Sequence, residues 1–395
     1  MMTERRRPHG EGSILQRGQD TWRLRYRING VRHSVSFTGT PAEAKKKLRE
    51  LLKSGDDGTH IDPSRMTVAQ WAEHWLSIGA PGKKKKSVGR RSLQRYGEFL
   101  RIHIVPHVGD RMLQQLHATD IDSLYDALAA KMAPNTAHMA HTIFSACLSA
   151  AVRKGLLLVS PMARCEKIPS PIEADHGQVL DKDQIAGLVQ SFKGTTLHPI
   201  VALAAYSGAR RNEILALRWC DLDPVAKTLR IERSLEQSQG QYRFKEPKRA
   251  KHKRTIQIDD ALIALLLSER EKHLRLVAGV PDGVAVDLSL IKLPADALMF
   301  PSFYTRDFDL TRPRECNGLT KQFEKHAHEM FPGLRFHDLR GSHETALLDA
   351  GVPVHVVAAR CGHDPATLLR SYAKRTKRAD ASAANVIAAM TRGVL

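Results

Sequence analysis

Basic and apolar side chains alternate near the start of the chain. Over Trp22–Ile28 the two kinds change places at every position, which puts one kind on each face of a β-strand. Asn29 and Gly30 form a strong signal for a two-residue hairpin turn. We therefore expect Val31–Phe37 to return as the next strand, and Gly12–Arg17 to supply an earlier one.

A helix is predicted for Pro41–Leu52, because proline is favoured in the first turn of a helix. Residues 1–55 are thus expected to form a three-stranded sheet with one helix, followed by a polar, glycine-containing linker. The basic face of the second strand carries Arg23, Arg25 and Arg27. The pattern alone leaves two interpretations open, a solvated charged face or a sheet that lies against DNA.

Apolar residues at helical spacing predict a helical domain over residues 66–165. Thr67 is suited to cap the first helix, and the second is expected to end before Pro106. A third helix covers Ile121–Leu128 and a fourth runs over residues 135–154. The first two helices are joined by a basic run that is either a solvated loop or a phosphate clamp: Lys83, Lys84, Lys85, Lys86, Arg90 and Arg91.

A proline-rich stretch, Ile168–Ile172, precedes a mixed α/β region that we assign to residues 176–395. Residues 268–296 carry no clear motif and are expected to be a helix end and a loop. The fold class is therefore multidomain α+β, with a small three-stranded sheet plus helix, a helical domain and a mixed α/β domain.

Charge points to a polyanionic partner. The 395 residues include 61 Lys and Arg against 42 Asp and Glu, a net charge of +19, which favours nucleic acid. The five cysteines are widely spaced and form no C-x-x-C pair, which argues against a disulfide framework or a structural zinc site and favours a cytoplasmic protein. No stretch is apolar and long enough to span a membrane, and the basic start lacks the apolar core of a secretory signal.

Two stretches of the last region carry residues suited to holding a phosphate. Gly208 is expected to end one helix and Arg210 to begin the next, so that amides and guanidinium meet at one anion, with Glu213 placed to orient an arginine. Taken alone, this is more simply a surface salt bridge. Further on, Lys248 follows a proline at the predicted tip of a hairpin, where it could donate a proton. Its basic neighbours fit plain phosphate contact: Arg249, Lys251, Lys253 and Arg254.

Two further stretches add histidines, an arginine and a tyrosine. His337 and Arg340 are three residues apart and face one side of a helix. His363 follows a glycine, and Tyr372 comes nine positions later on a predicted short helix. Each motif is weak by itself, since such pairs arise by chance and an exposed tyrosine is usually plain surface.

In this order the motifs resemble the catalytic signature of the tyrosine recombinase, or phage integrase, family. The resemblance implies that Arg210, Lys248, His337, Arg340 and His363 act on a phosphodiester that Tyr372 attacks, with Glu213 in support. It also implies a SAM-like, core-binding helical domain and, as in lambda-type integrases, an N-terminal arm-binding domain. Ser207 stands where the family usually has Thr, and Arg360-Cys361 replaces the usual apolar pair.

The resemblance further implies the reaction and the partners. The product of cleavage would be a 3′-phosphotyrosine, and rejoining would need neither metal nor nucleotide cofactor. The partners would be double-stranded DNA attachment sites, three further copies of the chain in a homotetramer, and an accessory DNA-bending or excision factor. The apolar end of the tail, residues 373–395, would dock on a neighbouring protomer.

Two alternatives remain open from the sequence. A type IB topoisomerase shares the chemistry but acts as a monomer, and a DNA-binding regulator on a retired recombinase fold would not cut DNA. The complete catalytic set argues against the regulator, and the small helical domain and the tail favour a recombinase.

The position of Lys248 generates a first prediction. If this lysine protonates the departing 5′ oxygen, Lys248→Ala slows cleavage far more than it weakens DNA binding. A substrate with a 5′-thio leaving group needs little protonation, so single-turnover cleavage of it should recover much of the lost rate. Failure of the sulfur substrate to restore cleavage would instead assign the acid to Lys251, Lys253 or a histidine.

Overall fold

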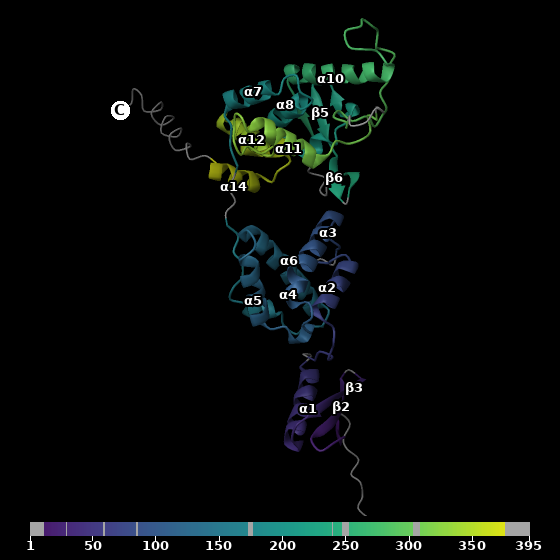
Figure 1. Cartoon of the computed structure of the whole chain (residues 1–395), viewed down its shortest axis with the longest axis vertical. Coiled ribbons are helices and arrows are strands. Elements are labelled where there is room, and N and C mark those ends of the chain that lie inside the picture. The colour runs from purple at the N-terminus through teal and green to yellow at the C-terminus, as the bar shows by residue number, and fades with distance from the viewer. Residues whose placement is uncertain are drawn as a thin grey trace, which may run out of the picture. The chain divides into compact units, whose positions relative to one another are not determined.

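The computed structural model describes residues 12–28, 30–57, 60–83, 86–172, 177–238, 240–246, 253–302 and 309–375. The chain divides into two compact units, Met1–Glu173 and Ala174–Leu395, and Figure 1 shows the elements of each. No helix in the described ranges is long and apolar enough to cross a bilayer.

The first unit begins with the predicted three-stranded antiparallel sheet. It contains β1 (Ser13–Gln16), β2 (Thr21–Ile28) and β3 (Val31–Thr38), with β2 in the centre. Ile28 pairs with Val31, which confirms the register expected for a two-residue turn, and Gly30 has the positive φ of 80° that this turn requires. Asn29 lies outside the described residues.

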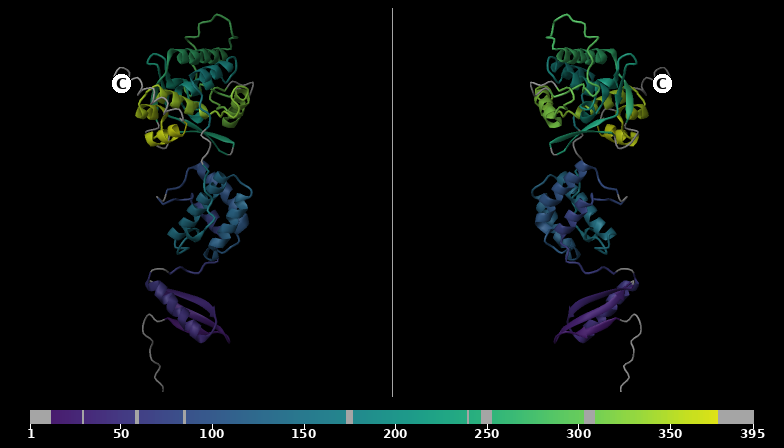
Figure 2. Two further views of the ribbon diagram at one scale, coloured as in Figure 1. Left: turned by 90° about the vertical axis from the view of Figure 1, so that its left-hand side faces the viewer. Right: turned by 90° about the vertical axis from the view of Figure 1, so that its right-hand side faces the viewer.

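Helix α1 (Pro41–Asp56) lies against one face of this sheet, as Figure 2 shows. Leu24 and Tyr26 of β2 are buried with Leu48 of α1, while the arginines that alternate with them in the strand are exposed on the other face. The alternation seen in the sequence is therefore confirmed. The helix is longer than the predicted Pro41–Leu52 and extends to Asp56, because no proline follows to stop it before Pro63. A Thr40–Glu43 capping box fixes its start.

The rest of the first unit is helical. Its elements are α2 (Val68–Ser77), α3 (Arg90–Phe99), the π-helix η1 (Leu100–Ile104), α4 (Val105–Val108), the 3₁₀-helix η2 (Leu113–Gln115), α5 (Ala118–Ala129), α6 (Pro134–Arg153) and the 3₁₀-helix η3 (Pro161–Arg164). Trp71, Trp75 and Phe144 are among its fully buried side chains. These helices enclose one apolar core.

The prediction that the second helix ends before Pro106 is wrong. Helical structure continues through Pro106 because η1 changes the hydrogen-bonding period just before it, and the proline then occupies the first turn of α4. The missing N–H is tolerated there, since the first amides of a helix have no partner within it.

The second unit packs helices around two small sheets. Its elements are α7 (Lys182–Ser191), α8 (His198–Ser207), α9 (Arg211–Ile214), η4 (Trp219–Asp221), β4 (Leu222–Asp223), β5 (Thr228–Ile231), β6 (Ser234–Ser238), β7 (Gln241–Lys245), β8 (Arg254–Gln257), α10 (Asp260–Ala278), α11 (Cys316–Ala327), α12 (Asp338–Asp349), α13 (Val354–Cys361) and α14 (Pro365–Arg375). Helix α8 is buried on nearly all sides, which explains why its residues are apolar all round.

The strands of this unit correct the hairpin expected around Lys248. Strand β7 pairs with β6, whereas β8 pairs with β5 in a different sheet, so the two strands that flank the basic stretch are not partners of each other. The sequence suggested a hairpin because apolar and polar residues alternate on both sides of the basic stretch. Such alternation predicts a strand but does not identify the strand with which it pairs. Residues 247–252, which include Lys248, Arg249 and Lys251, lie outside the described residues, as does the tail beyond 375.

Candidate active site

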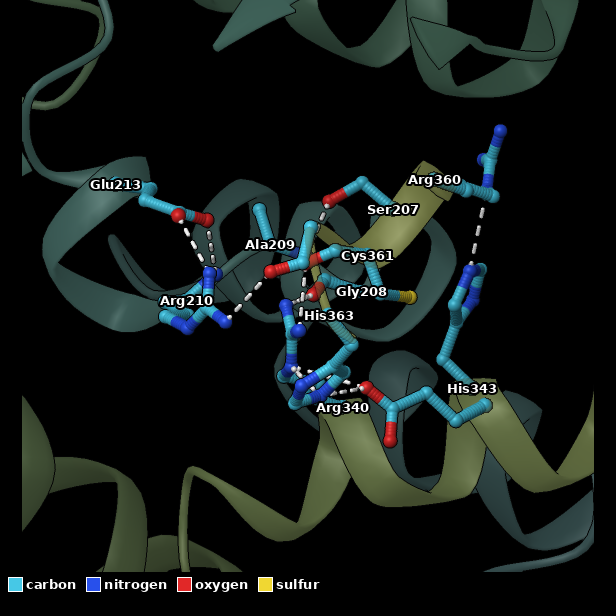
Figure 3. Close-up of polar contacts among 12 residues, drawn as sticks. Ser207, Gly208, Ala209, Arg210, Glu213, Arg340, His343, Arg360, Cys361 and His363 are labelled. Carbon is cyan, nitrogen blue, oxygen red and sulfur yellow. Dashed lines mark hydrogen bonds and ion pairs between the residues drawn. The ribbon is translucent and has the colours of Figure 1, made fainter. Parts of the chain in front are cut away.

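Three arginines meet at the C-terminal end of α13. Arg254 Nε donates to the carbonyl of Arg360 at 2.7 Å, Arg340 Nη2 to that of Cys361 at 2.6 Å, and Arg210 Nη2 to that of Gly362 at 3.1 Å. The last carbonyls of a helix lack partners within the helix and carry partial negative charge. They therefore bring together guanidinium groups from distant parts of the sequence, two of which appear in Figure 3.

Gly208 provides a second anchor for Arg340. It ends α8 with a φ of 65°, and its carbonyl accepts a 2.5 Å hydrogen bond from Arg340 Nη1. A Cβ at this position would lie 2.6 Å from His343 Cδ2 and 2.9 Å from Cys361 Sγ. The site therefore requires glycine for both backbone conformation and space.

The residues that depart from the family pattern fit this arrangement. Ser207 Oγ accepts from the amide of Ala209, so the serine closes the helix end as a threonine hydroxyl would. Arg360 Nε donates to His343 Nε2 at 3.2 Å. Cys361 is fully buried, and burial raises the pKa of its thiol to about 11, so it stays protonated and is not a nucleophile at neutral pH.

Glu213 holds two of the arginines in place. Its carboxylate accepts hydrogen bonds from Arg210 Nη1 at 2.9 Å and from Arg254 Nη2 at 2.8 Å. The side chains of Glu213 and Arg254 are both almost completely buried. Burial alone would raise the pKa of Glu213, but Arg254 and Arg210 outweigh it and lower the pKa to about 2. The carboxylate is thus ionised at any physiological pH.

Arg254 does not occupy the position that the sequence suggested. Its side chain is only 6% exposed and is held by Glu213 and the Arg360 carbonyl. The expectation that it contacts DNA does not fit this burial. The structure instead makes it a support for Glu213.

Glu344 was missed by the sequence analysis. Its Oε1 lies 3.0 Å from Arg340 Nε and 2.8 Å from His363 Nε2, and its side chain is 4% exposed. The signal that could have found it is its position four residues after Arg340 on one helix. Burial, followed by the nearby charge of Arg210, lowers the pKa of Arg340 to about 10, so the Glu344 pair holds a guanidinium that is still charged at neutral pH.

His337 lies at the N-terminus of α12, beside a surface cavity of about 450 Å³. Arg210, Arg211 and Arg335 also line this cavity. Loss of solvent around the ring, and then the positive charge of Arg340, lower the pKa of His337. The imidazole is therefore mainly neutral near pH 7 and suited to accept a proton, next to a concave basic surface suited to an anion.

Tyr372 is not held at the arginines. It lies on α14, and its hydroxyl donates to Asp349 Oδ1 at 2.8 Å. Asp349 ends α12, nine residues after Arg340. At about 1.5 Å of rise per residue, the two Cα positions are roughly 13 Å apart along the helix.

The remaining basic residues occupy several surfaces. Of the residues predicted to contact DNA, seven are exposed in the first unit: Arg23, Arg25, Arg27, Lys83, Lys86, Arg90 and Arg91. Lys253 forms an ion pair with Glu246 at 2.8 Å. Lys84 and Lys85, like Lys248, Arg249 and Lys251, fall outside the described ranges.

The chain belongs to the phage integrase family, whose profile matches residues 178–378. It is thus a tyrosine recombinase, an enzyme that cleaves and rejoins DNA at specific sites. An integrase of Streptomyces ambofaciens is 25% identical over 384 residues, covering 91% of this chain and 90% of that protein. A "tyrosine recombinase XerC-like" protein of Caldanaerobacter subterraneus subsp. tengcongensis is 23% identical over 378 residues, covering 89% and 91%.

Solved structures show the same fold. The Tn1549 transposon integrase in complex with a circular intermediate DNA has a TM-score of 0.63 at 14% identity, covering 82% of this chain and 99% of that one. A lambda integrase tetramer bound to a Holliday junction has a TM-score of 0.54 at 14% identity, covering 91% and 97%. These likenesses confirm the predicted fold class.

The buried Arg340–Glu344 pair generates a prediction about stability. Glu344→Ala leaves the buried guanidinium without this partner, so we expect the second unit to lose about 3 kcal/mol of unfolding free energy. For a unit of this size that corresponds to a fall of about 6–12 °C in its melting transition, measured by scanning calorimetry.

Glu271→Ala is the matched control. Glu271 also pairs with an arginine four residues away on a helix, but its side chain is 54% exposed. Its loss should shift the same transition by about 2 °C or less, because exposed pairs contribute little. Equal shifts in the two variants would show that the Arg340 pair has no special structural weight.

Proposed function

We propose that Arg210, Arg340 and His363 bind the phosphate that is cut, and that Tyr372 attacks it to form a 3′-phosphotyrosine. The observation that carries this proposal is the convergence of Arg210 and Arg340 on the end of α13, beside His363 and next to the basic cavity lined by His337. Guanidinium groups fixed in this way offset the negative charge that builds on the phosphoryl oxygens. The Arg340 side chain is only 3% exposed in this arrangement, so the proposal requires its guanidinium to become accessible before the phosphate binds.

Proton transfers are assigned to two further residues. His337, neutral and at the cavity, accepts or relays the proton of the tyrosine hydroxyl. Lys248 supplies the proton to the departing 5′ oxygen. Rejoining reverses these steps with another 5′ hydroxyl, and the covalent intermediate conserves the energy of the broken bond.

Tyr372 must leave Asp349 before it can attack. The hydrogen bond to Asp349 holds the hydroxyl near the far end of α12 from Arg340. A movement of α14 is therefore part of the proposed cycle. In this proposal the structure shows the enzyme before cleavage, and the movement of α14 brings Tyr372 to the phosphate.

The domain assignment is likewise a proposal. Residues 1–55 would bind arm-type DNA through Arg23, Arg25 and Arg27, and residues 66–165 would bind core DNA with the basic run from Lys83 to Arg91. Residues 176–395 would carry the chemistry. The exposed, one-sided arrangement of the three arginines on β2 supports the first of these assignments.

We further propose that the enzyme acts as a homotetramer on paired attachment sites and integrates or excises a mobile element. The lambda integrase tetramer on a Holliday junction, which shares the fold, supports this assembly. An accessory bending or excision factor would set the direction of the reaction. Nothing in the comparisons favours a type IB topoisomerase or a retired regulator.

The nucleophile is tested by Tyr372→Phe. The variant should bind core-site DNA as the wild type does, yet trap no covalent complex on a nicked suicide substrate, because it lacks the attacking oxygen. Denaturing gel electrophoresis measures the adduct. Tyr206→Phe, which removes another partly exposed hydroxyl in the same unit, should leave adduct formation unchanged. A covalent adduct from the Tyr372→Phe protein would refute the assignment.

The three arginines on the exposed face of β2, here called the arginine stripe, are tested by the salt dependence of DNA binding. Replacing Arg23, Arg25 and Arg27 by Ala should reduce the slope of log K against log salt by about 0.9 for each phosphate that the variant no longer binds, measured on a complete attachment site. Integration should fall while cleavage of isolated core sites persists.

A charge-matched control is available on α1. Replacing the exposed Lys45, Lys46 and Lys47 by Ala removes the same charge from the helix on the other side of the sheet. If this variant lowers the slope as much as the arginine variant does, the effect is one of net charge, and the stripe is not an arm-binding surface.

A further inference from the structure

Two histidines and an aspartate outside the proposed active site point toward one another. His33 Nδ1 lies 2.7 Å from Asp62 Oδ1, and His60 Nε2 lies 3.3 Å from the same oxygen. The three ligand atoms all fall within 4.8 Å of one another. Both histidine side chains are largely covered, at 15% and 10% exposure, while Asp62 is 70% exposed.

The sheet and α1 hold this cluster in place. His33 on β3 is the cross-strand partner of Tyr26 on β2, and the two rings stack at 5.5 Å. The His60 ring meets both of them edge-on, at 5.5 Å from Tyr26 and 5.1 Å from His33. Its second nitrogen, Nδ1, lies 3.5 Å from Ser54 Oγ near the end of α1. Metal-binding histidines commonly have such an outer partner, which orients the ring.

Tyr26 supplies an independent observation. Its side chain is 3% exposed, and the described residues offer its buried hydroxyl no hydrogen-bond partner. A tyrosine hydroxyl is both a donor and an acceptor, so it is able to donate a hydrogen bond here. A buried donor without an acceptor is costly, and a metal-bound water in this cluster would give it one.

We propose that His33 Nδ1, His60 Nε2 and the Asp62 carboxylate bind a zinc ion, with a water as the fourth ligand. Two imidazoles with one carboxylate match the donor set that zinc prefers over magnesium or calcium. Bonds of about 2.0–2.1 Å in a tetrahedron put neighbouring ligand atoms about 3.3 Å apart. The His60–Asp62 distance already has this value, and the His33–Asp62 distance needs an expansion of about 0.6 Å, which the exposed Asp62 side chain can accommodate.

The proposed ion would fasten the segment after α1 to the sheet. His60 and Asp62 follow α1, whereas His33 belongs to β3, so one ion joins two stretches of chain that the sequence separates. The site uses the face of β2 that carries Tyr26, opposite the face that carries the three arginines. Zinc would therefore shorten the free tether between the N-terminal module and the following helices without occupying the arginine surface.

Zinc retention by the full-length chain tests the site. Protein stripped with EDTA is reloaded with ZnCl₂, passed through a desalting column and analysed for zinc per chain by mass spectrometry. The wild type should retain one more zinc than each of His33→Ala, His60→Ala and Asp62→Ala, whose affinity should fall by at least about 100-fold. His107→Ala and Asp110→Ala, which remove exposed residues of the same types, should retain zinc as the wild type does.

His60→Ala guards against a folding artefact, because His60 lies outside the sheet. Equal zinc content in the wild type and the three site variants would overturn the proposal and leave the cluster as a set of His–Asp hydrogen bonds.

Trypsin provides a second readout, since Arg65 is exposed just beyond the segment. Zinc should slow cleavage after Arg65 severalfold in the wild type and leave it unchanged in His33→Ala. Cleavage that zinc does not slow in the wild type would refute the fastening of this segment.

Discussion

The second unit depends on the attraction between arginine side chains and the backbone carbonyls at the end of α13. Arg254, Arg340 and Arg210 bind three successive carbonyls there, those of the last two helix residues and of the glycine that follows them. Like charges that approach this closely repel one another, and the helix end together with Glu213 and Glu344 offsets that repulsion. The fold thereby concentrates positive charge before any substrate arrives.

Sequence reasoning predicted the parts of this site that depend on local pattern. The helix break at Gly208, the His337–Arg340 spacing and the strand that exposes Arg23, Arg25 and Arg27 all follow from periodicity within a few residues. The three-stranded sheet and its register were accessible for the same reason, because the turn length fixes which residues face each other.

Contacts between residues far apart in the chain could not be predicted from local pattern. Arg254 looks like one more basic residue in a basic stretch, and only the packing of β8 against α13 shows that it is buried on Glu213. The pairing of β7 and β8 with different strands was hidden for the same reason. Continuation of the helix through Pro106 depends on a π-turn, for which the sequence carries no clear local signal.

The two faces of strand β2 have different environments. Leu24 and Tyr26 are buried in the core on one face, and the arginines that alternate with them are exposed on the other. The deletion of a single codon at one end of this strand would shift the register of the whole strand by one residue and exchange the two sets. Three guanidinium groups would then be directed at the α1 face and the apolar side chains at solvent. Evolution of this module is therefore expected to tolerate changes of residue type along β2 much more readily than changes of length. Length variation among natural variants should gather instead in the loops outside the strand.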